Sequence, residues 1–158
     1  MSNLATEQMA TLASGYCELV ESFDENSLDN WLTDVAELLP KLHRAVDGLE
    51  QAKSMGVYEH RADYDARFEM FTRLYQALGE RNGYSYEYDG LDGQRLSGSL
   101  ADDITDIYFD LKHGLSVLIN DPTMAAHEWQ HSYEFHWRHH LLDAERQLLG
   151  APEAAANN

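Results

Sequence analysis

Hydrophobic residues recur at three- and four-residue steps along most of the chain, a period typical of helices that bury one face. The pattern predicts helices over about 4–23, 28–49, 61–79, 100–119 and 122–149. Pro40 predicts a kink or a break in the second helix, because proline lacks an N–H and crowds the preceding turn. We therefore expect an all-α bundle of about five helices, with a single helical domain over 1–150 and a flexible tail over 151–158.

Helix-start residues mark two of these boundaries. Ser99 suits the N-cap of the fourth helix, with Asp102 three residues further on in a variant of the capping box. Asp121 suits the N-cap of the fifth helix, and Pro122 its first position. Because the turn between them is short, the last two helices are expected to be antiparallel neighbours.

The segment RNGYSYEYDGLDGQRLSGS, over 81–99, is rich in glycine, aspartate and serine and has no helical period. Tyr84, Tyr86 and Tyr88 alternate as residues of a short strand do. Three alternating positions are a weak pattern, so we expect one long Tyr/Gly-rich loop whose tyrosines cover an end of the core. An aromatic binding platform is the alternative interpretation.

Composition limits the classes of function. With 158 residues and a hydrophobic fraction of 44%, the chain can form one domain with a substantial core. It has 11 Lys and Arg against 28 Asp and Glu, a net charge of -17. Such a charge repels phosphate backbones and anionic lipid, so we expect neither nucleic-acid nor membrane binding.

The cellular compartment follows from three further observations. Cys17 is the only cysteine, which excludes an internal disulfide and fits a reducing compartment; we expect it to be a small buried hydrophobic residue. The first residues lack the basic and apolar regions of a secretion signal. No apolar stretch approaches the roughly 20 residues that span a bilayer. We therefore expect a cytoplasmic protein.

The segment HEWQHSYEFHWRHH holds five of the eight histidines and opens with His-Glu-x-x-His. On a helix, His127 and His131 would share one face and could hold zinc, with Glu128 as the base of a peptidase. No third ligand follows at the spacing that such peptidases use. The helical wheel also places both histidines opposite the inner face. We therefore interpret this motif as surface histidines without a catalytic role.

A second histidine pair offers a better candidate site. His136 and His140 share the predicted inner face, and equal distances from the turn at Asp121 bring them level with aspartates of the fourth helix. The candidate cluster comprises Asp102, Asp103, Asp106, Asp110, His136 and His140, with the neighbouring aromatic residues Tyr108, Trp129, Tyr133 and Trp137. These groups could form a structural hydrogen-bond network, which we favour. Alternatively, His136, His140, Asp103 and Asp106 could hold a divalent metal such as Zn.

The segments SLADDITDIYFDLKHGL and HEWQHSYEFHWRHHLLDAERQLL resemble the bacterial family known as domain of unknown function 5063. That family has a double Asp, an Asp-Ile-Tyr-x-Asp-Leu helix, and a later helix of the form Phe-x-x-His-Trp-Gly-x-His. The matching positions are Asp102, Asp103, Asp106, Ile107, Tyr108, Asp110, Leu111, Trp129, His136, Trp137 and His140. The chain has Arg138 where the family has Gly, so close helix approach is not expected there. The resemblance implies a helical fold and no particular reaction, and the His-Glu-x-x-His is not part of it.

Two classes of function remain open. The first is a non-enzymatic interaction or scaffold protein that needs no cofactor and binds an unidentified protein partner. The second is a metal-binding protein or metal-dependent hydrolase that uses the His/Asp cluster. A stripe on the last helix, opposite Trp129, also predicts a homo-oligomer; it consists of Met124, Phe135, Leu142 and Leu149.

Overall fold

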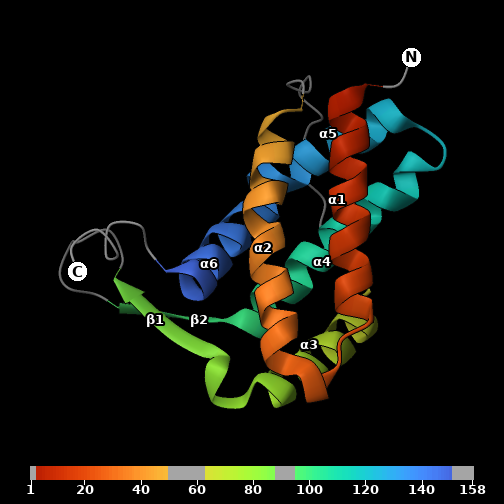
Figure 1. Ribbon diagram of the computed structural model, residues 1–158. Helices are drawn as coiled ribbons and strands as arrows, with labels where there is room; N and C mark the ends of the chain where they lie inside the picture. The colour runs from red at the N-terminus through yellow and green to blue at the C-terminus, as the bar shows by residue number, and fades with distance from the viewer. Residues whose placement is uncertain (1–2, 50–62, 88–94, 151–158) are drawn as a thin grey trace.

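The computed structural model describes residues 3–49, 63–87 and 95–150, and helices dominate it (Figure 1). The α-helices are α1 (Leu4–Glu21), α2 (Leu28–Asp47), α3 (Tyr64–Leu78), α4 (Leu100–Leu118), α5 (Pro122–Ser132) and α6 (Arg138–Leu149), with 3-10 turns at Glu25–Ser27 and Gly79–Arg81. The predicted all-α class is confirmed. The expected tail lies outside the described residues. Among the helices described, none has the length and apolar character that crossing a membrane requires.

The core forms around α4, which packs against α1, α3, α5 and α6. In Figure 1, α1 and α2 run antiparallel, side by side, on the near side of α4. The largest fully buried side chains come from all six of these α-helices and the turn before α6: Met9, Tyr16, Leu39, Leu42, Leu74, Leu100, Ile104, Ile107, Leu111, Trp129, Trp137 and Leu141. Cys17 is buried among them, as predicted.

A glycine allows α5 to approach α4 closely. The indole N–H of Trp129 donates a hydrogen bond to the carbonyl of Leu111, at 3.2 Å. A Cβ atom placed on Gly114 would lie 1.9 Å from the Trp129 Nε1, far inside van der Waals contact. The absent side chain of Gly114 therefore leaves the space that the fully buried indole fills.

The predicted helix starts are confirmed. Of the kink or break predicted at Pro40, the break is wrong. Ser99 accepts a hydrogen bond from the amide of Asp102 at 3.2 Å, and Asp121 accepts one from the amide of Met124 at 3.1 Å. The helix α2 continues through Pro40. It buries an apolar face against α1 and α6, and this packing outweighs the hydrogen bond that the proline removes.

The interpretation of 81–99 as one long loop is also wrong. Strands β1 (Gly83–Glu87) and β2 (Arg95–Ser99) form an antiparallel pair in which Tyr84 lies opposite Gly98. The ring of Tyr84 lies so close that a Cβ on Gly98 would meet it at 2.3 Å. Alternating tyrosines marked β1, whereas the sequence of β2, Arg-Leu-Ser-Gly-Ser, has no apolar alternation to mark a strand. Position 88, part of the predicted alternation, lies outside the described residues.

The last predicted helix is interrupted by a π-helical turn, Tyr133–Trp137, between α5 and α6. A π turn has more residues per turn than an α-helix, so a wheel drawn at a constant 100° per residue fails beyond it. As predicted, Trp129 and His140 are buried. Trp137, in the π turn itself, is fully buried, and its indole donates to the hydroxyl of Ser132 at 3.0 Å.

Candidate functional site

Two buried aspartates of α4 flank a buried histidine of α6. Asp103 and Asp106 are each 3% exposed, and His140 is 7% exposed. The His140 Nδ1 lies 2.8 Å from an oxygen of Asp103, and its Nε2 lies 2.8 Å from an oxygen of Asp106. Both ring nitrogens therefore face carboxylates, and the predicted closeness of His140 to Asp103 is confirmed.

The second histidine lies further along α4 than the predicted register places it. The Nδ1 of His136 is 2.5 Å from an oxygen of Asp110, whereas its Nε2 is 3.8 Å from Asp106, the aspartate at an equal distance from Asp121 in the sequence. The extra residue in the π turn shortens the axial distance from Asp121, so His136 lies closer to the C-terminal end of α4.

An arginine from α3, which the sequence analysis missed, completes the cluster. The Arg67 Nε donates to an oxygen of Asp106 at 2.6 Å, and its Nη2 donates to Asp102 at 3.0 Å. One oxygen of Asp106 therefore faces Arg67 and the other faces His140. Arg67 joins α3 to α4, and no local pattern distinguishes it from a solvated arginine.

A tyrosine from the hairpin reaches the same cluster. The hydroxyl of Tyr84 donates to the second oxygen of Asp103, whose first oxygen faces His140. The carboxylate of Asp102 is more open, with 41% of its side chain exposed, and lies 4.0 Å from His140. The cluster thus joins α3, α4, α6 and β1 through polar contacts that satisfy both buried carboxylates.

The hydrogen bonds decide the protonation state of the histidine. Burial lowers the pKa of His140, but hydrogen bonds to Asp103 and Asp106 outweigh it and raise the pKa to about 10. His140 is therefore an imidazolium at neutral pH. Burial raises the pKa of Asp106, yet His140 and Arg67 outweigh it and hold that pKa below its usual range. For Asp103, burial dominates and the pKa is raised.

Two overlapping groups of side chains have the residue types and spacing of a metal site. They are Asp106, His136 and His140, and Asp102, Asp103 and His140; within each group the ligand atoms lie within 4.8 Å of one another. A cation would have to displace the proton of His140 and compete with Arg67 for Asp106. The geometry allows a divalent metal, but the existing hydrogen bonds and ion pairs oppose it.

The His-Glu-x-x-His motif lies apart from these groups. His127, Glu128 and His131 are half-buried, so the two histidines are less exposed than the interpretation as surface residues predicts. An oxygen of Glu128 lies 3.6 Å from the Nε2 of His113 on α4. Neither metal-compatible group among the described residues includes a residue of this motif. That the motif has no catalytic role stays a prediction.

The four neighbouring aromatic residues contact the core. The hydroxyl of Tyr108 donates to Glu21 on α1 at 2.6 Å. Trp129 bonds to the carbonyl of Leu111, and the rings of Tyr133 and Trp137 meet edge to face with centroids 4.6 Å apart. These side chains hold the helices around the cluster, and their contacts described here are not with its carboxylates or imidazoles.

Comparisons with known proteins extend the resemblance to the whole fold. The crystal structure of protein BF1032 from Bacteroides fragilis matches with a TM-score of 0.73 and 19% identity, covering 93% of this chain and 91% of that one. At that identity the likeness shows a shared fold. No curated protein matches the chain. A family model described as domain of unknown function (DUF5063) matches residues 2–151, a range that contains every helix and strand of the cluster, so the chain belongs to the DUF5063 family.

Proposed function

We propose that this protein is a non-enzymatic interaction module and that its partner is a basic amphipathic helix that packs along α3. The observation that carries the proposal is a row of aromatic side chains on that helix, which we call the α3 aromatic face: Tyr64, Phe68, Phe71 and Tyr75. Tyr64 is 74% exposed, Phe68 69% and Tyr75 53%. Phe71 is half-buried and stacks on Tyr75, with ring centroids 5.6 Å apart.

The spacing of this face matches a helix–helix contact. Its members follow one another at steps of four, three and four residues, the spacing of the apolar seam of a coiled coil. The buried residues of α3 are Leu74 and Leu78, and at about 100° per residue they lie beside Phe71, so the aromatic face borders the buried side of the helix. Exposed apolar patches commonly mark interaction sites, and aromatic side chains dominate the binding energy of many interfaces.

The negative charge around the α3 aromatic face favours a basic partner helix. The chain has a net charge of -17, and Asp65 and Glu69 are exposed on α3 beside the aromatic face. A partner helix with lysine or arginine next to its apolar residues would pair with these carboxylates and place cations over the aromatic rings. An acidic partner, or a second copy of this chain, would be repelled.

The His/Asp cluster has a structural role in this proposal. Arg67 lies on α3 and holds Asp102 and Asp106 of α4, and Asp106 also pairs with His140 of α6. These contacts fix the orientation of α3 and hence of its aromatic face. A face that is already rigid loses less conformational entropy when the partner binds.

Site-specific photocrosslinking in cells that express the full chain tests the proposal. A photoreactive phenylalanine derivative replaces Phe68 in one variant and Ile119 in the control. Ile119 is 83% exposed and lies at the far end of α4, so it matches Phe68 in exposure but not in location. We expect an adduct specific to position 68 whose crosslinked peptide has apolar residues at helical spacing and lysine or arginine beside them.

Three outcomes would contradict the proposal. Equal adducts at both positions would indicate non-specific contact, and an acidic crosslinked segment would contradict the charge argument. A crosslink to a second copy of the chain would replace the basic partner with self-association through α3.

Self-association would use a separate surface, the apolar stripe predicted on the last helix. Met124 is 40% exposed, Phe135 59% and Leu149 53%, so most of the stripe is accessible; Leu142 is half-buried. Light scattering at high micromolar concentration measures the mass of the particle and so tests for a homo-oligomer. If the protein is a monomer, the stripe is left for contacts with other proteins.

A divalent-metal protein, or a hydrolase built on that metal, is the second candidate function. It is supported by the closeness of Asp106, His136 and His140. Protein purified without an affinity tag would then contain near-stoichiometric Zn, Fe, Mn or Ni. A chelator would also lower the melting temperature of the wild type but not that of His136→Ala. Metal-free protein with an unchanged melting temperature would exclude this candidate.

A further inference from the structure

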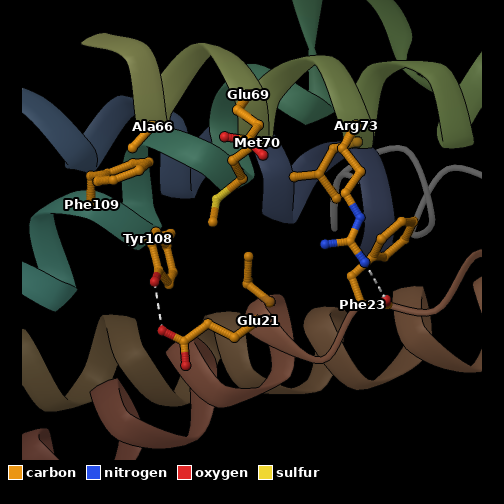
Figure 2. Close-up of a pocket in the computed structure, with 10 residues that line it drawn as sticks. Glu21, Phe23, Ala66, Glu69, Met70, Arg73, Tyr108 and Phe109 are labelled. Carbon is orange, nitrogen blue, oxygen red and sulfur yellow. Dashed lines mark hydrogen bonds between the residues drawn. The ribbon is translucent and has the colours of Figure 1, made fainter. Parts of the chain in front are cut away.

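A pocket of about 260 Å³ opens between α1, α3 and α4 (Figure 2). Most of its lining is apolar: Val20, Phe23, Ala66, Met70, Leu74 and Phe109. Figure 2 shows Met70 pointing into the space from α3, while Tyr108 and Phe109 approach from α4. An apolar cavity of about 150 Å³ is enough to bind benzene, so this pocket has the size for one or two fused aromatic rings.

The polar groups on two sides of the pocket are already engaged. The Arg73 guanidinium donates to the carbonyl of Phe23 at 2.9 Å and lies 5.3 Å from the centre of its ring. One oxygen of Glu21 accepts hydrogen bonds from Tyr108 at 2.6 Å and from Lys112 at 2.8 Å. Glu21 is therefore paired with a cation, Lys112, while the Arg73 guanidinium is held by a carbonyl and an aromatic ring.

Glu69 differs from Glu21 and Arg73 because no side chain of the described residues engages it. It is exposed at the rim of the pocket. The ion pairs of arginine and lysine among the described residues are formed with other carboxylates, so Glu69 has no cationic partner there. An unpaired carboxylate beside an apolar pocket favours a ligand that joins an aromatic ring to a protonated amine.

We propose that this pocket binds a small arylalkyl amine, with the ring between Met70, Leu74 and Phe109 and the ammonium group on Glu69. A thioether and an aromatic edge both form favourable contacts with an inserted ring. Apart from Glu69, which also borders the α3 aromatic face, the pocket lies away from the proposed partner helix. At about 100° per residue, Ala66 and Arg73 lie on the opposite side of α3 from Tyr64.

Calorimetry on the full chain at pH 7 tests the proposal with two probes, tryptamine and its neutral counterpart tryptophol. The probes share the indole ring and the two-carbon link and differ in the amine. We expect tryptamine to bind about tenfold more tightly, because a charge-assisted hydrogen bond is stronger than a neutral one. Glu69→Gln should remove this preference. Glu37→Gln, an exposed glutamate on α2 outside the pocket, should retain it.

A second variant tests the location. Ala66→Leu would fill part of the pocket, and both residues are strong helix formers, so the melting temperature should change little. We expect this variant to bind neither probe. Equal affinities of the two probes in the wild type, absence of tryptamine binding at millimolar concentration, or unchanged binding by Ala66→Leu would each overturn the proposal.

Discussion

The adjacent helices α3 and α4 place their side chains in opposite environments. Helix α4 buries two carboxylates, Asp103 and Asp106, which are each 3% exposed, whereas α3 leaves Tyr64 and Phe68 74% and 69% exposed. On α4, each buried oxygen has a partner within the chain, which offsets the cost of removing the charge from water. On α3, the described residues leave the aromatic rings largely uncovered. The buried carboxylates of α4 are thus satisfied within the chain, whereas the exposed rings of α3 fit the partner that we propose.

Removing the histidine at the centre of the cluster should have the largest effect. We expect His140→Ala to lower the free energy of unfolding by about 3–5 kcal/mol, because it leaves the buried carboxylate of Asp103 without a cation and that of Asp106 with Arg67 alone. Urea denaturation measures the change. His139→Ala is the matched control, since His139 is the adjacent, exposed histidine. A loss below about 1 kcal/mol would mean that the carboxylates find other partners.

Raising the pH should weaken the same contacts in the unmodified protein. The pKa of His140 is raised to about 10 in the folded chain, against about 6.5 for an ordinary histidine. Its contribution to stability is therefore fully present below about pH 6.5 and is lost as the pH rises through about 10. Denaturation curves at a series of pH values should show this decline, and His140→Gln should lack that part of it. Parallel curves for both proteins would contradict the assignment.

The close approach of α5 to α4 gives a smaller effect. We expect Gly114→Ala to lower the free energy of unfolding by about 1–3 kcal/mol, because the added methyl group would overlap the Trp129 indole. Gly15→Ala is the control: it also lies in a helix, α1, but a Cβ there would meet nothing within 4 Å. If both variants had the same stability, the contact between Gly114 and Trp129 would not limit the packing of α5.

The smallest effect should be on α3. We expect Phe68→Gln to change the free energy of unfolding by less than about 0.5 kcal/mol, because the ring is 69% exposed. The same variant should lose the position-specific crosslinked partner when the photoreactive group stands at Tyr64. A large loss of stability would show that the ring contributes to folding, and would remove the contrast with α4.

Local features of this fold can be predicted from sequence. Ser99 and Asp121 begin helices because the side chain of each accepts a hydrogen bond from the amide three residues further on. The contact between His140 and Asp103 could also be predicted, because a short turn fixes which residues of two neighbouring helices meet. A change of register within a helix could not be predicted. The π turn is such a change, and it places His136 beside Asp110.

Long-range contacts required the structure. Arg67 reaches Asp106 across 39 residues of sequence, and Tyr84 reaches Asp103 across 19, with no periodic pattern that links them. Periodicity also predicted that α3 has an apolar side, but it carries no information on whether another part of the chain covers that side. The burial of Leu74 and the exposure of Phe68 therefore became distinguishable only in three dimensions.

The π turn changes the direction, about the helix axis, in which the side chains of α6 point relative to those of α5. Counted at about 100° per residue, the buried positions of α6 point on average roughly 70° away from Trp129; they are His140, Leu141 and Ala144. Because each residue of the wider turn at Tyr133–Trp137 rotates the chain by less than about 100°, the turn compensates for this difference, and both α5 and α6 keep their apolar side on α4. The helical path from Pro122 to Leu149 therefore keeps its apolar side on α4 across the π turn, and the imidazole of His140 reaches the carboxylates of that helix.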